Sequence, residues 1–177
     1  QPSWSAETVL AYIPPLWLFV NGWLVLQVAG ALRLPLALRA VALGCFALLP
    51  LTQHLHSVGR IDHHFAEHTF ALAALWLGLR WASDWTHRGW AFALGLVLGI
   101  APACHNSLFI LQVPLVASML VLWLKREPLP GPSAVRFGFG LFSGALFAVA
   151  PSEPFWAGQF EFYVLSGFHL YVAAATA

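Results

Sequence analysis

Long runs of apolar residues, separated by short polar connections, fill almost the whole chain. The runs lie at about residues 9–32, 34–51, 65–81, 90–103, 108–124, 135–149 and 155–175. A helix needs about 20 residues to cross about 30 Å of hydrocarbon, so the shorter runs must form short, tilted or re-entrant helices. Pro14 and Pro15 should kink the first helix or delay its start. The pattern predicts an all-α, polytopic bundle of about six or seven transmembrane helices.

Composition agrees with the membrane class. Hydrophobic residues make up 60% of the chain and charged residues 8%, whereas soluble domains are about 25% charged. The formal net charge is +1, so no basic surface suggests a nucleic-acid partner. We expect residues 1–177 to form one transmembrane domain. Because the chain begins with Gln1 and ends inside an apolar run, we expect it to be a fragment of a longer protein.

Positive charges fall on alternate connections, which predicts an orientation. Seven of the eight Lys and Arg residues flank the first, third and fifth connections: Arg33, Arg39, Arg80, Arg88, Lys125, Arg126 and Arg136. The positive-inside rule makes these connections cytoplasmic. The second, fourth and sixth connections, which hold Asp62, His105 and Glu153, should then face the periplasm or lumen, most simply across a bacterial inner membrane. The proline-rich residues 125–133 are predicted to form a surface loop.

The densest group of polar side chains lies where the third run begins. Residues 59–68 read Gly-Arg-Ile-Asp-His-His-Phe-Ala-Glu-His. Residues three and four apart share a helix face, so His64, Glu67 and His68 should line one stripe, with Asp62 reaching it from the first turn. A carboxylate with imidazoles suits Mn, Zn or Fe better than Mg. The alternative is that Asp62 only caps the helix.

Residues 59–67 resemble the second acidic motif of the STT3-type oligosaccharyltransferases and related GT-C membrane glycosyltransferases. That motif often reads Asp-His-His and lies in a short non-cytoplasmic loop that opens a transmembrane helix. The resemblance implies that Asp62 and His64, its first and third positions, bind a catalytic divalent metal, Mn²⁺ or Mg²⁺, and that His63 does not. A weaker similarity at residues 151–156, Pro-Ser-Glu-Pro-Phe-Trp, implies that Glu153 helps to hold the acceptor. The family's first external loop and its soluble Trp-Trp-Asp domain have no match, as expected for a fragment.

The function implied by this resemblance is glycosyl transfer by a GT-C-like bundle. A sugar or oligosaccharide would move from a polyprenyl (pyro)phosphate donor to a protein or glycan acceptor, with membrane lipids around the enzyme. Asp62, Glu67 and Glu153 would be the catalytic residues, and Glu67 would orient a histidine or add a ligand. Arg60 would contact the donor phosphate, although it equally fits an arginine that reaches lipid headgroups. His105 would contact the substrate.

Two alternative functions use other sets of histidines. His64, Glu67 and His68 fit the H-x-x-E-H pattern of inverted zinc peptidases, in which two histidines bind zinc and the glutamate is the general base. A redox or transport subunit would instead use scattered histidines as haem or proton-relay ligands, namely His54, His56, His105 and His169. Separately, the polar residues inside the runs, Asn21, Gln27 and Glu161, should face the interior of the bundle.

Overall fold

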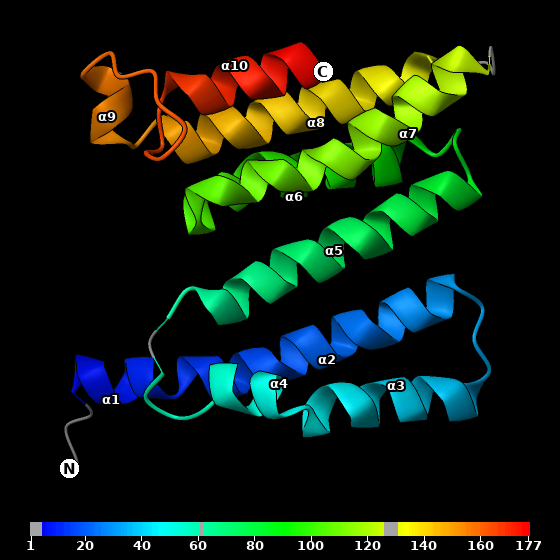
Figure 1. The fold of residues 1–177 in the computed structure, drawn as a ribbon, viewed down its shortest axis with the longest axis vertical. Helices are drawn as coiled ribbons and strands as arrows, with labels where there is room; N and C mark the ends of the chain where they lie inside the picture. Colours follow the sequence, from blue (N-terminus) through cyan, green and yellow to red (C-terminus); the bar gives the residue numbers. More distant parts are fainter. Residues whose placement is uncertain (1–4, 61, 126–130) are drawn as a thin grey trace. The chain divides into compact units, whose positions relative to one another are not determined.

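Every regular element in the described part of the chain is a helix. The computed structural model describes residues 5–60, 62–125 and 131–177. In chain order the elements are α1 (Ala6–Ala11), α2 (Ile13–Ala31), α3 (Leu36–Leu48), α4 (Pro50–Leu55), α5 (His64–Ser83), α6 (Arg88–Cys104), the 3-10 helix η1 (Asn106–Gln112), α7 (Val113–Leu124), α8 (Gly131–Val149), α9 (Glu153–Trp156) and α10 (Gly167–Thr176) (Figure 1). The predicted all-α class is therefore confirmed.

The chain forms two compact units, whose boundary lies inside helix α5. The N-terminal unit runs to Leu72 and the C-terminal unit begins at Ala73. The N-terminal unit contains α1 to α4 and the first turns of α5, and the C-terminal unit contains the remainder. The expected single transmembrane domain stays a prediction.

Prolines divide the N-terminal unit into helices. Tyr12 separates α1 from α2, and Pro14 lies in the first turn of α2, where its missing N–H has no helical partner to lose. The first run is therefore interrupted beside Pro14 and Pro15, but its helical part does not start late, because α1 already begins at Ala6. Pro35 precedes α3, and Pro50 opens α4. Between α2 and α3, which lie side by side in Figure 1, Arg33 adopts a positive φ of 58°.

Helices α6 and α8 form the centre of the C-terminal unit. Gly95 and Gly99 of α6 face the backbone of α8, so closely that a Cβ at either position would collide with it. Trp81 is 1% exposed and stacks on Phe137 of α8, with ring centroids 5.5 Å apart. Helix α10 packs along α8 (Figure 1). Small residues thus bring the helices together, and large side chains fill the core beside them.

Two helices in the described residues are long and apolar enough to cross a membrane, judged by length and composition. They are Ala6–Ala31, which combines α1 and α2, and Gly131–Val149, which is α8. The helices Leu36–Leu48, Arg88–Cys104 and Asn106–Leu122 are apolar but shorter. These findings give weak support to membrane association, and the finer prediction of six or seven spans is not confirmed.

Two sequence predictions about helix bounds are wrong. The last apolar run does not form one helix, because α9 ends at Trp156 and α10 begins only at Gly167. Gly158, with φ of 72°, takes the left-handed conformation that ends a helix, and the Ser166 capping box starts the next one. The predicted loop at residues 125–133 is also shorter than expected, because α8 already begins at Gly131; residues 126–130 lie outside the described residues.

Candidate metal centre

The candidate centre stands at the start of α5, in the N-terminal unit. The chain leaves α4 and turns at Gly59, whose φ is 79° and whose N–H donates to the carbonyl of Ala11 at 2.9 Å. Asp62 follows, and the carbonyl of His63 accepts from the backbone N–H of Glu67 at 3.1 Å as the helix begins. His64 and Glu67 are three apart on α5 and so share a face. Asp62 and His63 join this face from the turn.

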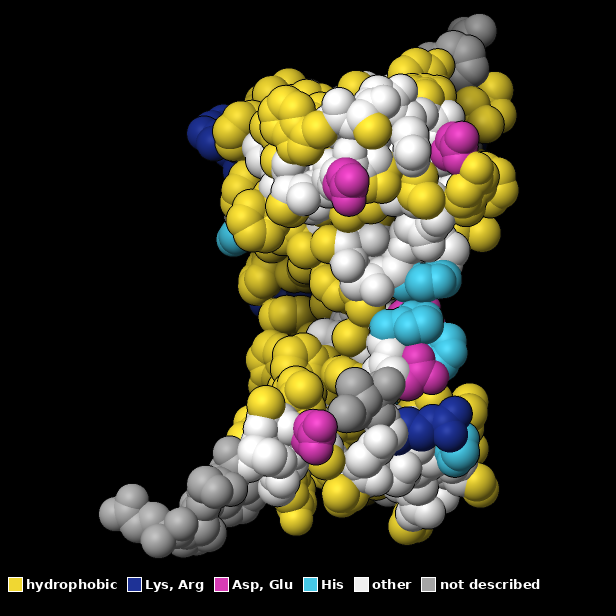
Figure 2. Space-filling view, turned by 90° about the vertical axis from the view of Figure 1, so that its left-hand side faces the viewer, with side chains coloured by type: hydrophobic (Ala, Val, Ile, Leu, Met, Phe, Trp, Pro, Cys, Tyr) yellow, Lys and Arg dark blue, Asp and Glu magenta, His cyan; other side chains and the backbone are white. Residues whose placement is uncertain are grey.

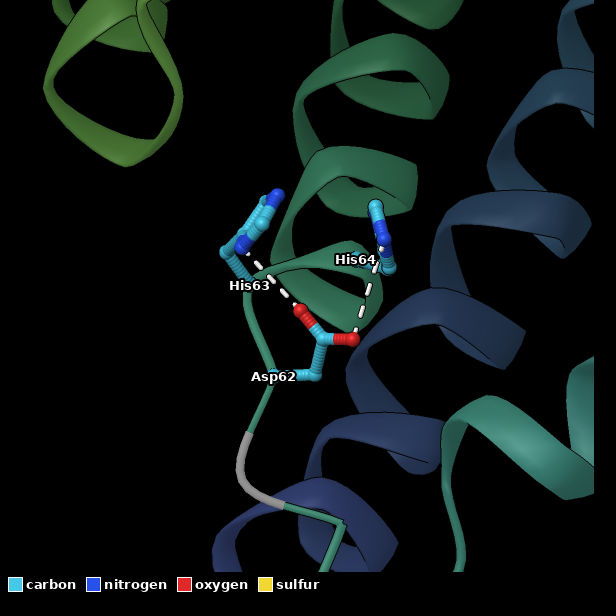
Figure 3. Close-up of side chains that lie close together, drawn as sticks. All are labelled: Asp62, His63 and His64. Atoms are coloured by element: carbon cyan, nitrogen blue, oxygen red, sulfur yellow. Dashed lines mark ion pairs between the residues drawn. The ribbon is translucent and has the colours of Figure 1, made fainter.

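Four side chains form a closed ring in which carboxylates and imidazoles alternate. Asp62 Oδ1 lies 3.0 Å from His63 Nδ1, and Asp62 Oδ2 lies 3.7 Å from His64 Nε2. On the other side, Glu67 Oε1 lies 3.4 Å from His63 Nε2, and Glu67 Oε2 lies 2.8 Å from His64 Nδ1. Figure 3 shows the carboxylate of Asp62 between the two imidazoles. Each carboxylate therefore bridges both rings.

The charges of the ring favour a bound cation. The carboxylates of Asp62 and Glu67 stand on either side of the two imidazoles, and carboxylate oxygens are natural partners of a cation. The hydrogen bond to Glu67 raises the pKa of His64; the charges of Asp62 and Glu67 act in the same direction, whereas desolvation and the charge of Arg60 act against it. Because the side chains of His63 and His64 are 41% and 46% exposed, a ligand from solution can reach them. Figure 2 shows that histidine and acidic side chains gather on the face in view.

Asp62, His63 and His64 are suited to hold a divalent metal. Their ligand atoms all lie within 4.8 Å of one another. Ligand atoms at about 2.0–2.2 Å from a common metal are at most about 4.4 Å apart, so small rotations of these exposed side chains would bring all three into place. One carboxylate and two imidazoles suit Mn, Zn or Fe. Three protein ligands also leave coordination positions open for water or another ligand.

The structure brings together most of the predicted motif and adds one residue to it. Asp62, His64 and Glu67 lie together as expected. The resemblance implied that His63 is not a ligand. In the structure, however, the imidazole of His63 lies closer to the carboxylate of Asp62 than the imidazole of His64 does, at 3.0 Å against 3.7 Å. Glu67 contacts both imidazoles, as a residue that orients ligands would. Arg60 is exposed and near enough to His64 to influence its charge.

Other predicted residues lie elsewhere. His68 uses Nδ1 to hydrogen-bond the backbone carbonyl of His64 at 3.2 Å, and its ring stands 6.3 Å from that of His56. Glu153 and His105 belong to the C-terminal unit. Glu153 is exposed at the first position of α9, and His105 Nδ1 lies 2.6 Å from the hydroxyl of Ser107. Their predicted roles towards acceptor and substrate stay predictions.

Two of the histidines considered as redox ligands are buried and hydrogen-bonded through both ring nitrogens. His56 is 4% exposed and contacts the carbonyl of Thr52 and the amide of Asn21. His169 is 2% exposed and contacts the carbonyl of Asn106 and the backbone N–H of Ser166. In this conformation neither ring has a nitrogen available for a haem iron.

Sequence reasoning did not place polar side chains of α2 behind the centre. Asn21 is 0% exposed, as predicted for a polar residue inside an apolar run. Its Nδ2 donates to the carbonyl of Phe65 at 2.9 Å, one residue beyond His64. Trp17 and Thr69 join the same network. Their spacing could have revealed a shared face within each helix, but no sequence signal pairs α2 with α5.

Comparisons with protein-family models, curated proteins and solved structures gave no match to this chain.

Proposed function

We propose that the protein is a metal-dependent membrane glycosyltransferase of the GT-C type. It transfers a sugar or oligosaccharide from a polyprenyl (pyro)phosphate donor to a protein or glycan acceptor. The observation that carries this proposal is the group of Asp62, His63 and His64, with ligand atoms within 4.8 Å of one another, at the start of an apolar helix. This is the location and the residue pattern of the motif that the sequence resembles.

Each residue of the centre has a role that follows from its chemistry. Asp62 and His64 would hold the divalent metal, and His63, whose Nδ1 lies 3.0 Å from Asp62 Oδ1, would be a third ligand. When bound, the metal neutralises developing charge on the phosphate leaving group. Glu67 holds the imidazole of His64 in a fixed orientation through its 2.8 Å hydrogen bond. Arg60, beside the ring, offers a guanidinium that matches phosphate oxygens.

The proposal includes a membrane setting. Six or seven helices would span the membrane, including those too short to cross it untilted. Residues 1–177 would form a single transmembrane domain in a bacterial inner membrane, with the metal centre facing the periplasm. The alternation of positive charges supports this orientation. Membrane lipids and the lipid-linked donor are then the expected partners.

Donor consumption tests the proposal without knowledge of the acceptor. The detergent-solubilised protein is incubated with a panel of polyprenyl phosphate and pyrophosphate sugars, and release of the polyprenyl product is measured. We expect turnover that stops with chelator, returns with Mn²⁺ and falls about 100-fold in Asp62→Asn. Asp84→Asn is the matched control, because Asp84 is an exposed aspartate whose carboxylate contacts Thr86. Failure of the wild type to consume any donor, or full activity in Asp62→Asn, would contradict the proposal.

A further inference from the structure

A continuous chain of hydrogen bonds runs through the interior of the N-terminal unit. The indole Nε1 of Trp17 lies 2.6 Å from Thr69 Oγ1, and Thr69 Oγ1 lies 2.7 Å from Asn21 Oδ1. Asn21 Nδ2 lies 2.9 Å from His56 Nε2, and His56 Nδ1 lies 2.8 Å from the carbonyl oxygen of Thr52. These five residues come from α2, α4 with its C-cap, and α5. The chain therefore joins three helices.

The two ends of the chain fix the direction of every bond. The indole of Trp17 can only donate, so Thr69 Oγ1 accepts from it. The hydroxyl proton of Thr69 goes to Asn21 Oδ1 at 2.7 Å, which is nearer than its second acceptor, the carbonyl of Phe65 at 3.4 Å. The carbonyl of Thr52 can only accept, so His56 carries its proton on Nδ1. His56 Nε2 is then the acceptor for Asn21 Nδ2, and the imidazole is neutral. Only one arrangement of the amide of Asn21 satisfies all of these partners.

That arrangement has a consequence for the start of α5. Asn21 Nδ2 has two protons, and the second goes to the carbonyl of Phe65 at 2.9 Å. Phe65 follows His64 directly and lies two residues before Glu67. Its ring also packs edge-on against Trp17, with centroids 5.9 Å apart. The buried amide thus binds the backbone turn that carries the ring of carboxylates and imidazoles.

We propose that Asn21 is a positioning residue for the metal centre and that Thr69 and His56 hold its amide in the required orientation. The inference rests on the proposed metal site. The four side chains of the ring are partly exposed, whereas Asn21 is completely buried. The ring residues are therefore held in place from the buried side, where Asn21 binds the backbone of α5. Because partners that orient ligands typically change metal affinity 10–100-fold, loss of this anchor should weaken metal binding.

Thr69→Val separates positioning from folding. Valine keeps the shape of threonine but removes the hydroxyl, so Asn21 Oδ1 loses the donor that fixes the amide orientation. Thr69→Ser restores that hydroxyl. Leu24→Ala is the control for instability, because Leu24 is 3% exposed on α2 and has no part in the chain. For each variant, Mn²⁺ affinity is measured by electron paramagnetic resonance of the free ion, and thermal stability by circular dichroism.

We expect Thr69→Val to weaken Mn²⁺ binding at least about 10-fold, Thr69→Ser to bind as the wild type does, and Leu24→Ala to keep its affinity despite a lower melting temperature. Wild-type affinity in Thr69→Val would overturn this inference and leave the metal site intact. Equal loss of affinity in Leu24→Ala would overturn it too, because general instability would then be the cause. Absence of Mn²⁺ binding in the wild type would refute the proposed function and this inference together.

Discussion

The close approach of α6 and α8 predicts that one added methyl group at Gly99 destabilises the C-terminal unit. A Cβ at Gly99 would lie 2.3 Å from the carbonyl oxygen of Leu141 and 2.7 Å from the backbone nitrogen of Ala145. Carbon contacts are favourable at about 3.5–4.0 Å, so the two backbones would have to separate by about 1 Å. The atoms that the new methyl group would meet belong to the backbone of α8, which cannot rotate away as a side chain can.

The magnitude follows from two opposing effects. Alanine is favoured over glycine in a helix interior by about 1 kcal/mol. Overpacking costs about 1–3 kcal/mol, and collision with backbone belongs at the upper end of that range. The difference is a loss of about 2 kcal/mol in the free energy of unfolding for Gly99→Ala.

Gly78→Ala is the matched control for this substitution. Gly78 lies in α5 within the same unit, and a Cβ there meets nothing within 4 Å. Only helix propensity remains, so the control should gain up to about 1 kcal/mol. Unfolding in detergent, followed by tryptophan fluorescence during titration with a denaturing detergent, compares the two variants. A Gly99→Ala protein as stable as Gly78→Ala would refute the packing described for α6 and α8.

Three further predictions concern buried side chains, each measured by the same unfolding titration. Trp81→Ala should cost about 3–5 kcal/mol, because Trp81 is 1% exposed and its indole donates to the carbonyl of Trp85; wild-type stability would contradict its place in the core. Ser166→Ala should cost about 1 kcal/mol through loss of the α10 cap, and an unchanged midpoint would contradict that capping role. Burial lowers the pKa of His56 from its ordinary value of 6.5, so the unfolded chain takes up a proton at higher pH than the folded one, and stability should fall as pH drops below about 6.5. His56→Gln should weaken this pH dependence, and a persistent full dependence would assign it to another group.

The helices of this chain are largely predictable from its sequence. The first six apolar runs correspond to the helical segments from α1 to α8, and Pro14 indicates where α2 begins. The last run misled the prediction because hydrophobicity alone does not exclude an irregular segment. Gly158 and Ser166 interrupt that run by backbone conformation and capping, which are local effects that an apolar average conceals.

The candidate centre was predictable where its residues are close in sequence. Helical spacing brought His64 and Glu67 together, and Asp62 joined them from the preceding turn. The contact of His63 with both carboxylates depends on the turn geometry, which spacing does not specify. The anchor at Asn21 is 44 residues from Phe65 in sequence, so its partner depends on tertiary packing alone.

The proposed binding of one divalent metal by Asp62, His63 and His64 can be tested directly, because Mn²⁺ itself reports its ligands. Pulsed electron paramagnetic resonance of the Mn²⁺-loaded protein detects directly coordinated imidazole nitrogen. We expect nitrogen couplings that decrease in His63→Asn and in His64→Asn and are unchanged in His54→Asn, because His54 is exposed on α4. Absence of nitrogen coupling in the wild type, or couplings that survive both substitutions at His63 and His64, would contradict it.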